Sequence, residues 1–148
     1  MIESRLGPRG HKVIDPMVDL AHCSKLDRII LAGANSAALM FELHKRGYVR
    51  VTTTANCGLP ARQYEAALVD WGGRSLKALD ATLAWLVDFL SPAGVLVVWL
   101  DHQATAENRK FRAILEKHGM TAQARVVRQH GSAVAAQRLD MKAISEVA

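Results

Sequence analysis

Two acidic residues and a histidine stand directly after long apolar runs, where α/β proteins often place their chemistry. Asp70 follows the run YEAALV, and Asp101 and His102 follow VLVVWL. A carboxylate at such a point can orient a substrate amine or hydroxyl, and it can act as a base where apolar neighbours such as Trp71 raise its pKa. Histidine can transfer a proton near neutral pH. The sequence therefore predicts Asp70 and His102 as candidate catalytic residues.

Both acidic residues also have a purely structural interpretation. Asp70 precedes Gly72-Gly73, and aspartate commonly caps a turn of this kind, so the turn role and the site role stay equally open. For Asp101 we favour a capping role over a dyad with His102, because residues i and i+1 of an extended chain point apart. The remaining histidines and the two isolated cysteines lack the spacing of metal ligands, so no metal is expected.

A lone glycine marks a second candidate site, within the stretch IILAGANSAALM. This stretch is typical of a buried strand that runs into a helix, a junction at which α/β proteins often hold a nucleotide-like ligand. Gly33 can serve a ligand or only the tight turn, and both interpretations stay open. Asn35 or Ser36 can cap the helix. The candidate binding residues in this stretch are Gly33, Ala34, Asn35 and Ser36.

Alternating strands and helices must position these residues. We expect residues 1–15 to form a polar N-terminal arm and residues 16–24 a short helix that opens with proline. Ile29–Leu31 is a continuous apolar run typical of a strand covered on both faces. A helix over residues 35–47 ends at a glycine, and the β-branched segment Val49–Thr54 is a second strand.

The second half of the chain repeats this pattern and then changes. The segment before Asp70 is a third strand, and a leucine-rich helix capped by Ser75 follows it. Trp85 and Trp99 are expected in the core, which leaves Trp71 open to a role in the site. The later elements are a turn at residues 91–94, a strand at 95–100, a helix at 106–118 and a hairpin around residues 129–132.

Strands that alternate with helices predict a mainly parallel sheet with helices on both faces, a three-layer α/β sandwich that ends in an antiparallel hairpin. The 148 residues, half of them apolar, suit a single domain, with residues 16–148 as its α/β core. Ligands bind such sheets at the carboxyl ends of strands where the winding reverses. We therefore expect the ends of the first and third strands to lie side by side and to form the site.

The later half of this pattern resembles the class I S-adenosylmethionine-dependent methyltransferases. The stretch YEAALVDWGG…LKALDATLAWLVDFLSPAGVLVVWLD is similar to the family's fourth strand, helix, Pro-Gly turn and fifth strand. The stretch FRAILEKHGMTAQARVVRQHGSAVAAQRLD is similar to its last helix and terminal hairpin. Together they cover about half the chain. The resemblance implies a Rossmann-like fold, S-adenosylmethionine as cofactor, and methyl transfer to a substrate nitrogen or oxygen near Asp70 and His102.

The cofactor half departs from the family's pattern. The family has an acidic residue before a G-x-G-x-G run, whereas Ala32 precedes Gly33 here and only one of the three glycines is kept. The acid that holds the ribose hydroxyls is expected near Thr54 to Asn56, where this chain has none. The link to the third strand is too short for the family's extra helix and strand. The resemblance still implies cofactor contacts by Asn56, Asp70 and Trp71 besides the glycine loop.

Charge and composition limit the other classes of function. The formal net charge is +5, but the basic residues are scattered and lack interleaved aromatic residues, which argues against nucleic-acid binding. We expect neither a signal peptide nor a membrane span, and the isolated cysteines fit a reducing cytoplasm. A G-x-S-x-G motif and a P-loop are both absent.

Two functional hypotheses remain. The first is a methyltransferase-like protein that binds S-adenosylmethionine with weak or lost activity toward an unknown small-molecule substrate. The second is a noncatalytic Rossmann-like interaction module, with the fold kept and the pocket lost, which self-associates or binds a partner. An open crevice at Asn35 and residues 54–56 favours the first hypothesis, and side chains that fill it favour the second.

Overall fold

The fold is seen in a computed structural model, which describes residues 7–53, 62–72, 74–101, 108–129 and 131–138. Six strands form one sheet in the order β2-β1-β3-β4-β6-β5. The first four strands are parallel, and β6 runs antiparallel to both β4 and β5. The strands are β1 Ile29–Gly33, β2 Val51–Thr53, β3 Tyr64–Asp70, β4 Leu90–Asp101, β5 Met120–Arg128 and β6 Gly131–Arg138. The predicted fold class and its C-terminal antiparallel hairpin are confirmed.

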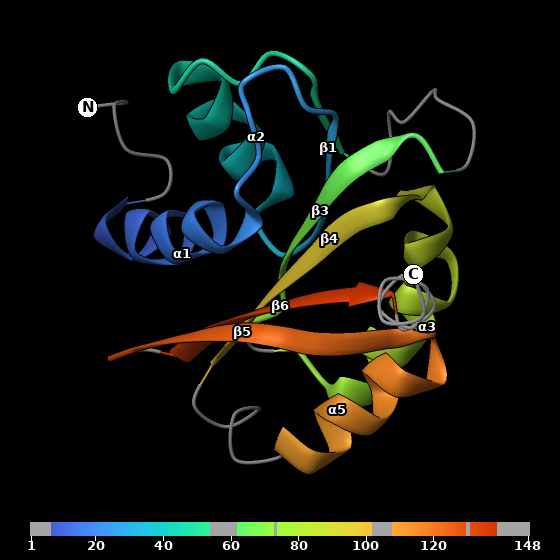
Figure 1. The fold of residues 1–148 in the computed structure, drawn as a ribbon. Coiled ribbons are helices and arrows are strands. Elements are labelled where there is room, and N and C mark those ends of the chain that lie inside the picture. The colour runs from blue at the N-terminus through green and yellow to red at the C-terminus, as the bar shows by residue number, and fades with distance from the viewer. Residues whose placement is uncertain (1–6, 54–61, 73, 102–107, 130, 139–148) are drawn as a thin grey trace.

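Helices cover both faces of this sheet, as Figure 1 shows. On one face lie α1 (Gly7–Ala21) and α2 (Ser36–Lys45), and on the other lie α3 (Leu76–Leu86) and α5 (Asn108–Lys117). A short 3-10 turn, η2, spans Val87–Phe89. The sheet therefore separates two apolar clusters, one under each helix layer. None of the described helices is both long and apolar enough to cross a membrane.

The central strands explain why the sheet is buried on both faces. Ile29, Ile30 and Leu31 of β1 have no exposed surface, although neighbouring side chains of a strand point to opposite faces. Ile30 packs in the cluster under α3 and α5, whereas Ile29 and Leu31 pack in the cluster under α1 and α2. The continuous apolar run in the sequence reflects this double burial, as is usual for parallel sheets.

The helix expected at residues 16–24 is longer and begins earlier, at Gly7, so most of the predicted N-terminal arm is helical. Pro16 lies inside the helix, where proline removes one backbone hydrogen bond. The gain that offsets this loss is burial, because Ile14 and Met17 are each 1% exposed and are covered by the sheet. Burying one such side chain contributes about 1.5–3 kcal/mol. The prediction that a helix begins at Pro16 is therefore wrong, because α1 continues through this proline.

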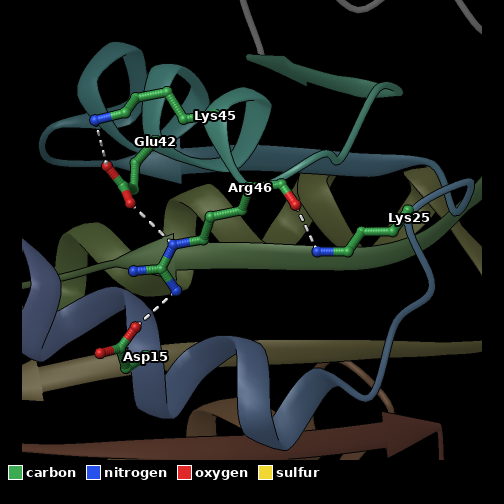
Figure 2. A network of polar contacts seen from close by, with 5 residues as sticks. All are labelled: Asp15, Lys25, Glu42, Lys45 and Arg46. Carbon is green, nitrogen blue, oxygen red and sulfur yellow. Dashed lines mark hydrogen bonds and ion pairs between the residues drawn. The ribbon is translucent and has the colours of Figure 1, made fainter.

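Polar contacts join the end of α2 both to α1 and to the loop before β1. Figure 2 shows that Arg46, at the end of α2, forms ion pairs with Asp15 of α1 at 2.6 Å and with Glu42 of its own helix at 2.9 Å. Lys25 donates to the carbonyl oxygen of Arg46. Its ammonium group also lies over the ring of Tyr48. These contacts hold the two helices of this layer together.

The segment Ser91 to Gly94, expected to be a turn before a strand, lies within β4. The pairing of β3 with β4 moves from Tyr64 opposite Leu90 to Ala66 opposite Val95, so the segment forms an irregularity in the ladder. The carbonyl oxygen of Ser91 accepts a hydrogen bond from Arg138 at 2.6 Å. Proline and glycine in this segment predict a turn that separates two elements. Here they produce only a shift in the pairing with β3, and the strand continues through it.

Candidate functional site

The carboxyl ends of β1 and β3 lie side by side, as the sequence predicts. Gly33 is directly opposite Asp70 in the parallel pairing, and the backbone N–H of Ala34 donates to the carbonyl oxygen of Asp70 at 2.7 Å. Gly33 has φ of 89°, a conformation that favours glycine, and a Cβ at this position would collide with that carbonyl oxygen. The turn and the neighbouring strand therefore both require glycine at position 33.

The loop after Gly33 turns directly into α2. Asn35 occupies the N-cap position with φ of 57° and ψ of 26°, a left-handed conformation that asparagine tolerates better than most residues. The prediction that Asn35 or Ser36 caps the helix is correct for the position of Asn35 but wrong for the bond, because the Asn35 side chain makes no capping hydrogen bond. The hydroxyl of Ser36 donates instead to the carbonyl oxygen of Gly33 at 3.1 Å. Neither the Asn35 side chain nor the Ser36 hydroxyl thus caps the first N–H groups of α2.

Asp70 ends β3 and is 6% exposed. Its Oδ1 accepts a hydrogen bond from the backbone N–H of Gly72 at 3.2 Å, which is the turn contact that the sequence allowed. The carboxylate therefore fixes the direction in which the chain leaves the sheet. Its backbone holds the glycine loop through Gly33 and Ala34, so Asp70 positions both sides of the candidate site.

Several solved structures with a similar fold are methyltransferases. A ribosomal protein L11 methylase from Lactobacillus delbrueckii subsp. bulgaricus is 11% identical with a TM-score of 0.61, over 82% of this chain and 74% of that one. A SAM-dependent methyltransferase from Aquifex aeolicus is 14% identical with a TM-score of 0.59, over 87% and 92%. The 1,6-didemethyltoxoflavin-N1-methyltransferase from Burkholderia thailandensis, solved with S-adenosylhomocysteine, is 17% identical with a TM-score of 0.55, over 84% and 77%.

The chain has the class I S-adenosylmethionine-dependent methyltransferase fold. At these identities the likeness concerns the fold alone. No protein-family model matches the chain, and no curated protein sequence matches it either. The resemblance noted in the sequence is thus confirmed at the level of architecture, and the site has to be judged from its own residues.

Trp71, which the sequence left open to a role in the site, belongs to the core of this methyltransferase fold. Its side chain is buried with 2% of the residue exposed, and its indole Nε1 donates to the carbonyl oxygen of Ser75 at 2.8 Å. The ring therefore offers no free face to a cofactor. Trp99 is buried as expected, whereas Trp85 is 42% exposed on α3, so the expectation of a core position is wrong for Trp85.

Two predicted site residues, His102 and Asn56, lie outside the described residues, as does the whole segment 54–56. Asp101, at the end of β4, is opposite Gly131 and partly buried. The roles predicted for His102 and Asn56 therefore stay predictions. Within the ranges that the structure describes, no group of three acidic, histidine or cysteine side chains could hold a metal ion.

The loop residues fit one part of S-adenosylmethionine better than the other. The residues Asn35 and Ala37, where the family has glycine, are both exposed. The uncapped first turn of α2 presents N–H groups that suit a carboxylate. The sequence supplies no acid at residues 54–56 for the ribose hydroxyls. The loop thus keeps the strand-turn-helix backbone of the methyltransferase fold, and the sequence lacks the acid that the resemblance places at residues 54–56.

Sequence reasoning missed the left-handed conformation of Asn35. Asparagine is enriched in this conformation, and its place two residues after Gly33 was a usable signal. The contact from Ala34 to Asp70 carried no such signal, because it joins residues far apart in the sequence through the register of two strands.

Proposed function

We propose that this protein binds S-adenosylmethionine at the carboxyl ends of β1 and β3, with low affinity, and that methyl transfer to a small molecule is its reaction. The observation that carries the proposal is the loop Gly33 to Ser36. It keeps the strand-turn-helix path of the methyltransferase fold through a left-handed Asn35, and it leaves the first turn of α2 uncapped. A cofactor carboxylate would be held by the N–H groups of that turn, where the helix dipole also favours negative charge.

Bound S-adenosylmethionine would supply an activated methyl group for a substrate nitrogen or oxygen. The contribution of this chain to that step is alignment, which can account for a large part of a bimolecular barrier. Asp70 fixes the turn that leads away from β3 through Gly72, and its carbonyl oxygen fixes the loop at Ala34. Asp70 is therefore proposed as a positioning residue, and His102 stays the candidate for contact with the substrate.

Low affinity follows from the missing ribose acid. A hydrogen bond to a charged group contributes about 1.5–3 kcal/mol, so a site without it binds about 10-fold to 100-fold more weakly. Calorimetric titration with S-adenosylmethionine and with S-adenosylhomocysteine tests the proposal. We expect saturable heat with both compounds at micromolar to millimolar concentration, and the absence of heat at millimolar ligand would contradict it.

A charge placed in the first turn of α2 gives the sharpest variant. Ala37 is exposed there, and A37D puts a carboxylate where helices tolerate it best, so the fold is kept while a second carboxylate is repelled. We expect A37D to lose measurable binding. The control is A81D, which adds the same charge to an exposed alanine of α3 on the other face of the sheet. Equal binding by the two variants would contradict this placement of the cofactor.

A noncatalytic module is the second candidate, and the hydrogen bond between Asp70 and Gly72 favours it. The carboxylate that could serve a substrate is engaged in a turn and nearly buried. Sedimentation or light scattering of the purified protein tests this candidate together with the titration. A stable oligomer that shows no heat with either ligand supports the module, and a monomer that binds S-adenosylmethionine excludes it.

A further inference from the structure

A small cavity lies between α5 and the last two strands, away from the proposed cofactor loop. Its volume is about 180 Å³. Phe111 of α5, Ala122 of β5 and Val134 of β6 give it an apolar floor, and Arg112 and Arg125 stand at its rim. In the sheet, β5 is separated from β1 by three strands, so the two sites are roughly 19 Å apart at about 4.8 Å per strand.

A bulge in β5 directs Arg125 into this cavity. Ala122 is opposite Ala136, and after the bulge at Gln123 the residue Arg125 is opposite Val134. Residues directly opposite one another in an antiparallel pair share a face, and both Ala136 and Val134 belong to the cluster under α5. Without the extra residue, positions three apart would face opposite ways. The bulge is therefore what brings Arg125 to the α5 side.

Arg112 and Arg125 are both exposed, unlike Arg46 and Arg138, which are partly buried and held by other groups of the protein. Arg46 is paired with two carboxylates, and Arg138 donates to two carbonyl oxygens. For Arg112 and Arg125, no ion pair to a carboxylate is formed within the described part of the chain. Arg125 makes only a long contact of 3.5 Å to the hydroxyl of Ser132. Two guanidinium groups without an acidic partner thus flank an apolar floor.

Two arginines beside an apolar surface indicate which class of ligand could bind in the cavity. Guanidinium groups bind oxyanions through paired, charge-assisted hydrogen bonds. An apolar cavity of about 150 Å³ can hold one benzene ring in another protein, so a floor of this size suits a body of one ring. Drug-sized ligands need about 300–1,000 Å³. We propose that the cavity between α5 and β5 is a binding site for a small organic oxyanion, with its carboxylate or phosphate on Arg112 and Arg125 and its apolar body on the floor.

The test uses benzoate, phenyl phosphate, benzamide and inorganic phosphate as probes, with amide chemical shifts and calorimetry at low ionic strength. We expect saturable binding of benzoate or phenyl phosphate, with shifts in α5 and β5, and at least tenfold weaker binding of neutral benzamide and of inorganic phosphate. The stronger of the first two probes identifies the head group. The proposal is overturned if neither binds, or if benzamide or inorganic phosphate binds as well as they do.

Charge-matched variants separate the site from general attraction to a basic surface. R112Q/R125Q removes the rim, and R109Q/R128Q removes two arginines of the same helix and strand that do not line the cavity. We expect at least tenfold weaker binding for the first variant and a change of less than threefold for the second. The A122L variant fills the floor and should weaken benzoate binding while leaving both arginines in place. Equal losses in the two arginine variants would overturn the proposal.

Discussion

Gly33 is fixed by the protein's own backbone, and this makes a prediction at the scale of a single residue. G33A would force alanine into a positive φ and bring its Cβ against the carbonyl of Asp70. We expect a loss of about 2–4 kcal/mol in the free energy of unfolding, measured with urea.

The control for this change is G119A. Gly119 also has a positive φ, of 77°, but its Cβ would meet no atom within 4 Å. It should lose only about 1 kcal/mol. If both variants lost the same stability, the contact between β1 and β3 would not be what requires glycine at position 33.

Asn56 allows a test by gain of function. The resemblance to methyltransferases expects the ribose-binding acid at residues 54–56, and N56D supplies one with almost no change in side-chain size. We expect N56D to bind S-adenosylhomocysteine about tenfold more tightly than the natural chain in calorimetry. The N108D variant, which makes the same change elsewhere, is the control. An N56D affinity no higher than that of the control would count against our placement of the ribose.

The roles of residues were predicted correctly where local rules determine them and wrongly where contacts with distant parts of the chain determine them. The turn at Gly33 follows from local rules, and so does the capping bond that the N–H of Ala78 donates to the hydroxyl of Ser75. Trp85 lies within the leucine-rich helix α3, but it comes two residues after Leu83 and so about 200° around the helix from it. Its ring contacts Phe89 edge to face at the surface. A core position on a helix is predicted only where a residue lies on the same face as the other apolar residues, and aromatic character alone does not predict burial.

At the scale of elements, Arg138 fastens the end of β6 to η2 and to the first residues of β4. Its guanidinium donates to the carbonyl oxygens of Ser91 and Val87, each at 2.6 Å. We expect R138M to lower the free energy of unfolding by about 2 kcal/mol, because two charge-assisted bonds are lost while the aliphatic stem is kept. R128M on the neighbouring strand should change it by less than about 0.5 kcal/mol. Equal effects in urea denaturation would contradict the clamp.

Asp80 joins α3 to the end of α5 and makes the protein's stability depend on pH. Its carboxylate accepts hydrogen bonds from Lys117 at 2.9 Å and shares a contact of 2.6 Å with His118, and these bonds hold the pKa of Asp80 below its usual range. A depressed pKa in the folded state means that the stabilisation is complete above the unfolded pKa and is lost as pH falls through the folded pKa.

We therefore expect D80N to lower Tm at neutral pH, and we expect the difference from the natural chain to shrink below about pH 4. D88N, at an exposed aspartate of η2, is the control and should leave Tm unchanged. Thermal unfolding followed by circular dichroism across pH 2.5–8 measures this, and a D80N difference that persists undiminished at pH 2.5 would contradict the account.

Element boundaries could be predicted only in part. The ends of α2 and α5 follow from Gly47 and Gly119, which come two residues after the helices and have positive φ. The early start of α1 could not be read from the sequence, because Pro16 is a strong local signal and the burial of Ile14 depends on strands that come much later. The bulge at Gln123 had no signal at all. It is visible only as a change in the pairing of β5 with β6.

At the scale of the whole molecule, the mainly parallel sheet with its antiparallel end is what the sequence predicted best. Apolar runs and helical stripes determined a mainly parallel sheet, and the hairpin around residues 129–132 reversed its last strands. The short link after β2 predicted that a unit of the methyltransferase fold is missing, and β2 is the edge strand of the sheet in the part of the chain that the structure describes. The identity of the ligand was harder to predict than the fold, because ligand binding depends on the placement of a few side chains.

The most direct test of our central claim is a titration of the isotope-labelled protein with S-adenosylhomocysteine, followed through its backbone amide shifts. Binding at the ends of β1 and β3 predicts saturable shifts at Ala34, Ser36, Ala37 and Gly72, with unchanged amides along β5. An unchanged spectrum at millimolar ligand, or saturable shifts confined to other parts of the molecule, would contradict the claim that this loop still receives the cofactor.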